Sequence, residues 1–386
     1  MKKYFLVGLL SLILGLLLSI AILTYKDTVI LKPNLTVEFN TNASVSDFIY
    51  HLDGTLLEDK TINTTKLGTQ KIKYNYKNNY GWYKTGTFNV EVIDTTSPII
   101  MVKSILTLSK GYDKKLEDTI LCGDEASDNV KCQIEGTYNL NKVGLYNLKI
   151  TAIDESNNKT EKSFILNIIN NTNNTDTSSY INYKDIYGKY KNTSTLIGLD
   201  ISKWQEEVDF EKLKKNNVEF IMIKLGGQSE IDGEINLDPY FYDNLEQSIN
   251  NNIKVGLYFY SYAKTPKEAK NQAKYILNAI KDYDITMPIA FDWENWTNYN
   301  EFNLSFYNLN SIAQSFINEI NTNGYKSLLY TSKTYLENIW YKENYNLWLA
   351  NYSNTQYQYP HKMWQVCSDG KINGINGYVD IDVYFK

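Results

Sequence analysis

The sequence predicts a multidomain protein with an irregular β/α (TIM-like) barrel at the C-terminus, two all-β sandwiches before it, and one N-terminal transmembrane helix. Its 386 residues exceed what a single hydrophobic core normally spans. Strand-like and helix-like runs alternate after residue 196, whereas residues 31–169 show short alternating runs broken by Asn, Asp, Gly and Ser. We therefore expect the divisions to be 1–25, 26–95, 96–170, 171–195 and 196–386.

The first segment predicts a membrane anchor. Residues Tyr4 to Tyr25 carry no charge and follow Lys2 and Lys3. As a helix rising about 1.5 Å per residue, this stretch would cross the roughly 30 Å hydrocarbon core with the lysines in the cytoplasm. We expect a single-pass protein of the cell membrane with extracellular C-terminal domains. The alternative is secretion after cleavage of a signal peptide near Ser19-Ile20-Ala21.

The β-rich region contains an internal repeat. Lys66-Leu67-Gly68 and Lys142-Val143-Gly144 each lead into a strand, a polar turn and a final strand. The run GLYNLKITAIDESNN at 144–158 resembles the immunoglobulin-like modules of bacterial surface proteins. This resemblance implies two immunoglobulin-like sandwiches with a mechanical role, holding the C-terminal domain away from the membrane. Binding of sugars or cell wall by these sandwiches is the alternative.

Two further features concern the segments around the second repeat. Cys122 and Cys132 flank a short loop and could pair or remain free, while Cys367 has no partner nearby in sequence. Residues 171–195 are rich in Asn, Thr and Ser and lack apolar periodicity, which predicts a flexible linker.

The C-terminal segment predicts eight strands with intervening helices. Thr265-Pro266-Lys267-Glu268 is a capping box that begins a helix reaching about Ile280, and a second helix runs from about Asn303 to Ile320. The helical patterns thin out after residue 340, so we expect an irregular barrel. The strand-like runs are 196–202, 219–225, 253–263, 287–293, 325–332, 346–352, 361–366 and 378–385.

Composition limits the chemistry that the chain can perform. The net charge is -5, and all 39 basic residues are lysines without a clustered patch, so no nucleic-acid partner is expected. His51 and His361 are the two histidines, which excludes an HExxH zinc motif and disfavours a Ser-His-Asp triad. We expect no cofactor and no metal, and calcium in the acidic loops of the second repeat stays an open alternative without support from a motif. The chemistry must rest on carboxylates.

Two carboxylates stand at the end of one predicted strand, in PIAFDWE. Asp292 and Glu294 project to the same side, about 6.6 Å apart along the chain. Strand ends line the active sites of β/α barrels, and two adjacent acids separate their pKa values. One proton donor beside one anion suits glycosidic bond cleavage. Asp200 and Asp380, on the first and last strands, should lie nearby. The alternative is a set of solvated surface acids.

Residues 197–386 resemble the glycoside hydrolase family 25 lysozymes, the muramidases of peptidoglycan. The resemblance rests on five motifs in the family's order: GLDISKWQ at 198–205, VGLYFYSYA at 255–263, PIAFDWE at 288–294, LWLANY at 347–352 and WQVCSDGKINGINGYVDID at 364–382. It implies cleavage of the bond between N-acetylmuramic acid and N-acetylglucosamine. The expected partners are peptidoglycan glycan strands.

The resemblance also implies roles for single residues. Glu294 would be the general acid, and Asp292 would stabilise developing positive charge or orient the 2-acetamido group. Whether Asp292 or the acetamido group is the nucleophile stays open. Asp200 and Asp380 would complete an acidic floor. Aromatic residues near these motifs are candidates for substrate contacts, namely Tyr260, Tyr262, Trp293 and Trp364, and Trp296 could offer a further stacking face.

Two positions depart from the family's usual pattern. Lys224-Leu225-Gly226-Gly227 replaces a run close to Arg-Ala-Gly-Tyr, which removes an aromatic at the cleft edge. Phe259 stands where the family often has histidine, so a polar contact would be missing. Both departures concern substrate contacts and leave the acids in place.

The sequence therefore favours a membrane-anchored peptidoglycan hydrolase, an N-acetylmuramidase acting on the cell's own wall. One alternative is a catalytically decayed surface protein that binds the cell wall. The presence of all four acids favours an enzyme, because decayed enzymes commonly lose their acids. A phage or secreted lysin is disfavoured by the predicted anchor.

Overall fold

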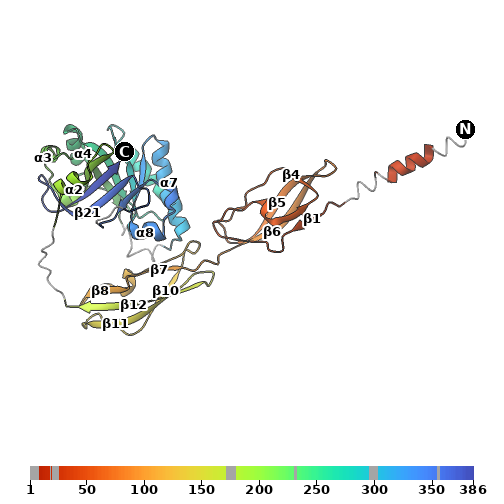
Figure 1. Cartoon of the computed structure of the whole chain (residues 1–386), viewed down its shortest axis with the longest axis horizontal. Coiled ribbons are helices and arrows are strands. Elements are labelled where there is room, and N and C mark those ends of the chain that lie inside the picture. The colour runs from red at the N-terminus through yellow and green to blue at the C-terminus, as the bar shows by residue number, and fades with distance from the viewer. Residues whose placement is uncertain are drawn as a thin grey trace. The chain divides into compact units, whose positions relative to one another are not determined.

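Figure 1 shows a computed structural model of the chain, in which residues 8–17, 19, 26–170, 180–229, 233–294, 303–353 and 357–386 are described. The chain divides into two compact units, with the boundary between Thr95 and Thr96. The second unit contains both a β module (96–170) and the barrel. Residues 8–17 are helical, and no helix within the described residues is both long and apolar enough to cross a membrane. The predicted anchor extends beyond the described residues at both ends.

The first unit is built on a four-stranded sheet in the order β2-β6-β5-β4, with a two-stranded sheet of β1 and β3. Alternate residues of β5 and β6 point inward, so that Tyr74, Phe88 and Val90 pack on Val45 and Phe48. The strands are β1 Val29–Leu31, β2 Thr36–Glu38, β3 Ile49–Leu52, β4 Gly54–Leu56, β5 Gly68–Asn78 and β6 Tyr83–Ile93.

The β module of the second unit repeats this pairing. Its main sheet has the order β10-β11-β12-β8, and β7 pairs with β9. In each module the final long strand pairs with the preceding strand as a hairpin and with a short strand in parallel. The internal repeat in the sequence therefore reflects a shared topology, while the immunoglobulin-like identity stays a prediction. The strands are β7 Ile99–Met101, β8 Ile105–Ser109, β9 Leu121–Gly123, β10 Lys131–Glu135, β11 Gly144–Ile153 and β12 Lys159–Ile169.

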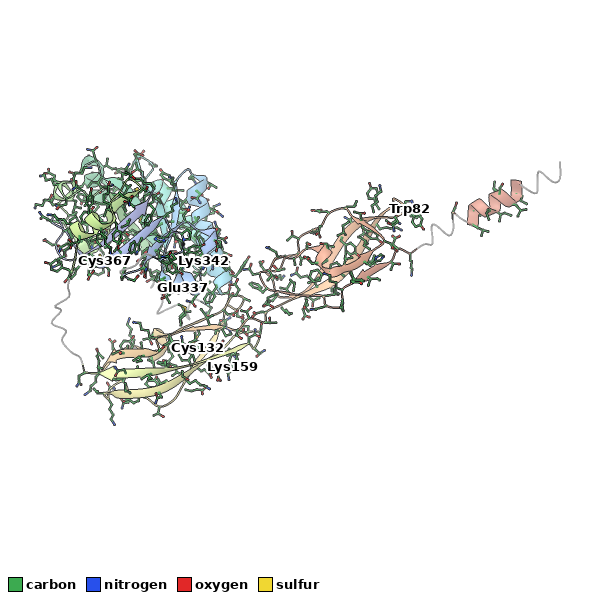
Figure 2. The ribbon with its side chains drawn as sticks, in the orientation of Figure 1. Trp82, Cys132, Lys159, Glu337, Lys342 and Cys367 are labelled. Atoms are coloured by element: carbon green, nitrogen blue, oxygen red, sulfur yellow. A yellow bond between two sulfur atoms is a disulfide. The ribbon has the colours of Figure 1, made fainter. Side chains whose placement is uncertain are left out.

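A disulfide joins the two cysteines of this module. Cys122 on β9 and Cys132 on β10 have Cα atoms 6.0 Å apart and are bonded. Figure 2 labels Cys132 and the buried free Cys367 of the barrel. The question that the cysteine spacing left open is answered by pairing within the module.

The barrel contains all eight predicted strands. Seven follow one another in parallel pairings from β14 to β21, and β22 runs antiparallel to both β14 and β21, which closes the sheet. The strands are β14 Thr195–Ile201, β15 Phe220–Gln228, β17 Lys254–Tyr260, β18 Ile289–Asp292, β19 Ser327–Ser332, β20 Leu347–Ala350, β21 Met363–Lys371 and β22 Val379–Phe385, with the short β16 Ile235–Leu237 beside β15.

The helices cover the outside of the barrel unevenly, as predicted. Thr265 caps α5: its Oγ1 accepts from the Glu268 amide at 3.2 Å, and the Glu268 carboxylate accepts from the Lys264 amide at 2.9 Å. After α8 the described chain has only the 3-10 turn η4, Lys342–Asn344. The helices are α3 Phe210–Lys215, α4 Phe241–Asn250, α5 Pro266–Ala279, α7 Phe306–Thr322 and α8 Lys333–Asn338.

The predicted linker 171–195 is wrong over its second half. Residues Ile181–Asn182 form β13, which pairs with β21, and Tyr183–Tyr190 form α2. Tyr183 is buried, and its hydroxyl donates to the Ile197 carbonyl at 3.2 Å. The apolar stripe of this helix consists mainly of tyrosines, so it was hidden in a polar composition. Residues 171–179 lie outside the described part.

A loop of the β module docks on the barrel. The carbonyls of Asp124 and Glu125 accept from the amides of Phe306 and Tyr307 at 2.8 and 3.2 Å, where α7 begins. Asp128 accepts from the Ser305 amide at 2.7 Å and from the Asn308 side chain at 2.6 Å; Glu125 accepts from the Tyr341 hydroxyl. Acidic groups and carbonyls thus satisfy amides at a helix N-terminus. Met101 and Leu121 of the module also join the barrel core.

We predict that Asp128→Ala weakens this docking. The variant loses two hydrogen bonds to a charged acceptor, each worth about 1.5–3 kcal/mol. Hydrogen exchange should become faster at the amides of residues 305–308, and the unfolding midpoint should fall. Asp113→Ala, an exposed acid of the same module, is the control. Unchanged exchange at 305–308 in Asp128→Ala would show that the loop does not hold the helix.

Candidate active site

The structure brings the four predicted acids to one cavity of about 500 Å³. Asp292 is the last residue of β18, and Glu294 follows two residues later. Asp200 on β14 is the ladder partner of Asp380 on β22. The antiparallel closure of the barrel therefore places acids from the beginning and the end of the domain beside the acids that follow β18.

The local sequence explains how the acids after β18 are presented. Alternate residues of a strand face opposite sides, so Phe291 and Trp293 point outward while Asp292 and Glu294 point to the cavity. Phe291 packs on Phe316 of α7 with ring centroids 5.2 Å apart. Trp293 packs against Trp340 at 6.0 Å and Tyr335 at 5.8 Å. The aromatic anchors hold the strand end, and this fixes both carboxyl groups.

Burial governs the ionisation of Asp292 and Glu294. Asp292 is 3% exposed, and burial, followed by the charge of Glu294, raises its pKa well above the usual range. Solvent reaches Glu294 through the cavity mouth, but protein atoms surround its carboxyl group on the other sides, and this loss of hydration raises its pKa. A hydrogen bond between the two groups raises the pKa of Asp292 and opposes the rise for Glu294. Burial therefore favours the protonated form of both carboxyl groups.

Lys224 is the cation that acts on this pair. It lines the same cavity, and its positive charge lowers the pKa of both Asp292 and Glu294, against the larger effect of burial. Its Nζ lies 4.9 Å from the ring centroid of Tyr260. The run Lys224-Leu225-Gly226-Gly227 thus places a lysine within electrostatic range of the two acids.

The other acids form a hydrogen-bonded group in which Asp200 and Asp382 are buried and Asp380 is partly exposed. Asp200 accepts from the Gln365 side chain at 2.8 Å, and Asp382 accepts from the Trp348 indole at 2.7 Å. Burial is the main cause that raises the pKa of Asp380 to about 6, and it raises those of Asp200 and Asp382 well above the usual range. Sequence reasoning missed Asp382, although the run VDID places it two residues after Asp380 on the same face.

Tyrosines connect this group to the rest of the cavity. The Gln365 carbonyl oxygen accepts from the Tyr330 hydroxyl at 3.0 Å and from the Tyr352 hydroxyl at 2.7 Å. Tyr330 pairs with Asp292 across the β18–β19 ladder. Gln365 therefore links Asp200 to Tyr330 on β19 and to Tyr352 just after β20, and it was not predicted as a site residue.

The predicted substrate-binding residues divide into two pairs. Tyr260 and Tyr262 line the cavity, with ring centroids 5.2 Å apart. The prediction of substrate contacts is wrong for Trp293 and Trp364, because both side chains are buried in the barrel core. Trp364 is held there by a 2.8 Å hydrogen bond from its indole to the Asn351 carbonyl. The strand alternation that aims Asp292 at the cavity aims Trp293 away from it.

A different tryptophan lies at the cavity. Trp204 lines it and is 76% exposed, and the motif GLDISKWQ could have identified it. Phe259 is fully buried on the outer side of β17, so that position cannot supply a contact in the cavity. Trp296 lies outside the described residues.

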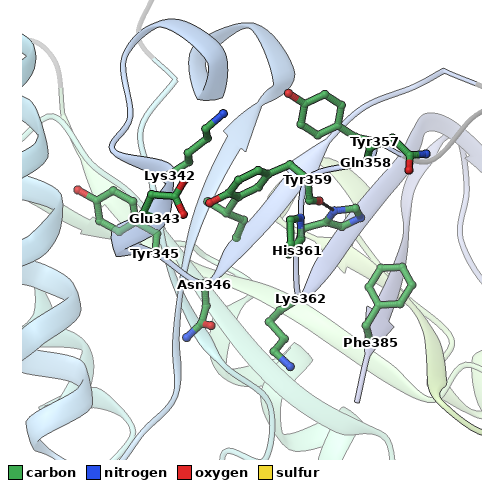
Figure 3. Close-up of a pocket in the computed structure, with 12 residues that line it drawn as sticks. Lys342, Glu343, Tyr345, Asn346, Tyr357, Gln358, Tyr359, His361, Lys362 and Phe385 are labelled. Carbon is green, nitrogen blue, oxygen red and sulfur yellow. Dashed lines mark hydrogen bonds between the residues drawn. The ribbon is translucent and has the colours of Figure 1, made fainter.

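A second pocket of about 490 Å³ lies at the opposite end of the barrel (Figure 3). It is lined by residues next to the starts of β20 and β21, including His361, whose Nδ1 lies 2.7 Å from the Tyr359 carbonyl. None of the four acids lines it. Among the described residues, the acids of the acidic cavity do not form a group whose ligand atoms lie close enough together to hold a metal ion.

Comparison with known proteins identifies the C-terminal domain. Residues 199–375 match the family described as Glycosyl hydrolases family 25. The Escherichia coli K12 protein YegX, which is uncharacterized, is 26% identical over 196 residues, covering 49% of this chain and 70% of YegX. An autolytic lysozyme of Clostridium acetobutylicum is 26% identical over 196 residues, covering 48% of this chain and 55% of its own. A family 25 lysozyme domain thus occupies residues 199–375.

Solved structures show the same similarity at lower identity. The modular autolysin LytC of Streptococcus pneumoniae, in complex with a synthetic peptidoglycan ligand, has 22% identity and a TM-score of 0.45. The match covers 61% of this chain and 56% of LytC. A family 25 glycosyl hydrolase of Bacillus anthracis has 20% identity and a TM-score of 0.43, covering 50% of this chain and 89% of that protein. This chain spans a little over half the length of LytC and of the clostridial lysozyme.

We predict that Asp380→Asn stabilises the protein more at pH 7 than at pH 4. Because the folded-state pKa of about 6 exceeds the usual 3.8, the folded state binds this proton more tightly than the unfolded state. Stability contributed by the group is present below pH 3.8 and declines as pH rises to about 6. A neutral asparagine removes that decline, so thermal unfolding should show a gain in melting temperature mainly at neutral pH.

The control for this prediction is Asp282→Asn, which changes an exposed acid of the same domain. It should move the melting temperature little at either pH. Equal shifts at pH 4 and pH 7 in Asp380→Asn would contradict the assignment of a raised pKa to that residue.

Proposed function

We propose that the C-terminal domain is an N-acetylmuramidase, a lysozyme that cleaves the β-1,4 bond between N-acetylmuramic acid and N-acetylglucosamine in peptidoglycan. One observation carries the proposal: Asp292 and Glu294 project together into a cavity that also contains Asp200 and Asp380, where burial raises the pKa of both. The family 25 match and the clostridial autolytic lysozyme support this assignment.

The different positions of the two acids divide their roles. Glu294 is reached by solvent from the cavity mouth, so a glycosidic oxygen can approach it. As general acid, Glu294 transfers its proton to that oxygen while the bond from the oxygen to the sugar C1 breaks. Asp292 lies deeper and faces the positive charge that develops at C1. Either Asp292 or the 2-acetamido oxygen then bonds to C1.

Substrate binding can place the proton on Glu294. In the free protein the hydrogen bond within the pair favours protonation of Asp292 over Glu294. An N–H donated by the substrate's 2-acetamido group to Asp292 would stabilise the Asp292 carboxylate, since hydrogen bonds to the charged form lower an acid's pKa. The proton is then retained by Glu294, where the leaving oxygen needs it.

The remaining cavity residues suit a sugar ligand. Trp204, Tyr260 and Tyr262 offer aromatic faces around the acids. The buried group of Asp200, Asp380 and Asp382 holds Gln365 and, through it, Tyr330 and Tyr352. This arrangement gives the floor a fixed hydrogen-bond geometry before substrate arrives.

We propose that this enzyme acts at the outer face of the cell membrane. The uncharged segment Tyr4–Tyr25 after two lysines supports a retained anchor. Determination of the N-terminus of the mature protein tests the proposal. Recovery of the original N-terminus from the membrane fraction is the expected result, and a new N-terminus at or near Ile22 would overturn it in favour of a cleaved signal peptide.

We predict that Glu294→Gln lowers the rate of wall cleavage by roughly 100-fold or more, the usual contribution of a general acid. Clearing of wall-embedded gels and mass spectrometry of the products measure this, and the wild-type products should end in N-acetylmuramic acid. Glu211→Gln on α3 changes an exposed acid and should retain full activity. If the wild-type chain clears no wall at any pH, the proposed muramidase activity is wrong.

We predict that Lys224→Met moves the alkaline limb of the pH–rate profile to higher pH. Lys224 lowers the pKa of Glu294, so its removal keeps the acid protonated over a wider range. The measurement is kcat/KM against pH on soluble glycan strands. Lys254→Met, an exposed lysine at the start of β17, is the control. A limb that stays in place or moves to lower pH would contradict the electrostatic role of Lys224.

A further inference from the structure

A further cavity, distinct from the pocket in Figure 3, adjoins the acidic cavity and shares Glu294 with it. Its volume is about 770 Å³. One wall belongs to the barrel and includes Tyr330 on β19, Tyr335 on α8 and Tyr352 just after β20. The other wall belongs to the β module: residues 100–103, at and just after β7, and Lys162 of β12. Glu294 thus stands at the junction of a cavity within the barrel and a cavity between barrel and module.

The module wall is fixed by contacts already described. The loop 124–128 holds the N-terminus of α7 through four hydrogen bonds from backbone and side-chain groups, and Met101 packs in the barrel core. Lys162 Nζ donates to the Ile100 carbonyl at 3.2 Å, which ties β12 to the end of β7. Residues 100–103 therefore have a defined position relative to Glu294.

The two cavities differ in charge. The acidic cavity is lined by Asp200, Asp292, Glu294 and Asp380 against Lys224 alone. Among the described residues that line the adjoining cavity, Glu294 is the one acid, and the cations are Lys103, Lys162 and Lys333. Lys333 has an acidic neighbour in Glu337 at 4.0 Å, whereas Lys103 and Lys162 take part in none of the ion pairs recorded in the described chain. The module therefore supplies two cations to a groove that begins at the general acid.

We propose that this groove binds the peptide stem of peptidoglycan, with the carboxylates of the stem on Lys103 and Lys162. The inference rests on the proposed function, because it assumes that a glycan strand lies across Glu294. The sugar rings of such a strand are neutral, and its negative charges are carried by the peptides attached to the lactyl groups of N-acetylmuramic acid. A cationic wall beside the cleavage site therefore selects the stem over further sugars.

The apolar part of the groove fits the same ligand. Val102 lies beside Lys103, and the rings of Tyr335 and Tyr352 face the groove from the barrel. Small methyl side chains of a stem peptide can contact these groups while its carboxylates reach the lysines. The second β module thus contributes to substrate recognition, in addition to any role as a spacer.

The proposal is tested with two substrates and one variant series in the full chain. The substrates are glycan strands that retain their stem peptides and the same strands after amidase removal of the peptides. In Lys103→Ala the KM for stem-bearing strands should rise roughly tenfold, the effect of one lost charge-assisted hydrogen bond, and further in Lys103→Glu. The KM for stripped strands and kcat should stay the same. Lys131→Ala, an exposed lysine of the same module outside the groove, is the control.

Binding of a soluble muramyl tetrapeptide to Glu294→Gln separates this proposal from the proposed function. Weaker binding in Glu294→Gln/Lys103→Ala than in Glu294→Gln supports the stem site even if the wild-type chain cleaves neither substrate, an outcome that would remove only the enzyme. Equal muramyl-peptide binding in both proteins, or equal KM changes on stem-bearing and stripped strands, overturns the stem site. Unchanged melting temperature in Lys103→Ala verifies that the variant is folded.

Discussion

The antiparallel closure of the barrel by β22 is the constraint on which the acidic cavity depends. β14 and β22 are separated by almost the whole domain in sequence, and their pairing sets Asp200 directly opposite Asp380. Four buried or partly buried carboxyl groups beside Glu294 are unfavourable as anions, because water is removed from each of them. The Gln365 amide and the Trp348 indole each donate to one of these groups and offset part of this cost. The raised pKa values in this cavity thus arise from the packing that closes the sheet.

The end of β18 shows how one strand serves the core and the cavity together. Its outward residues, Phe291 and Trp293, are packed against α7 and the region after α8, so the strand cannot rotate. Its inward residue Asp292 is thereby buried beneath Glu294. A rigid strand end holds the two carboxyl groups close enough to share a proton, which flexible surface acids would not do.

The β module next to the barrel belongs to the same compact unit as the barrel. Its acidic loop satisfies backbone amides at the start of α7, and its β7 region forms a wall beside Glu294. Through these contacts, the cavity beside Glu294 is lined by residues of both the barrel and the β module. The strand pairing of this module is the same as that of the first repeat.

The sequence by itself determined the eight barrel strands, the two capped helices and the grouping of the acids, because strand periodicity and capping are local and because the motifs occur in the family's order. It also determined that Asp292 and Glu294 face one way. The tertiary structure decided what depends on distant contacts: that Trp293 and Trp364 are core residues, that Asp382 and Gln365 belong to the acidic group, that residues 181–190 pack on the barrel, and that a module loop caps α7. Burial and hydrogen-bond partners are properties of residues brought together from far apart in the chain, and no local pattern encodes them.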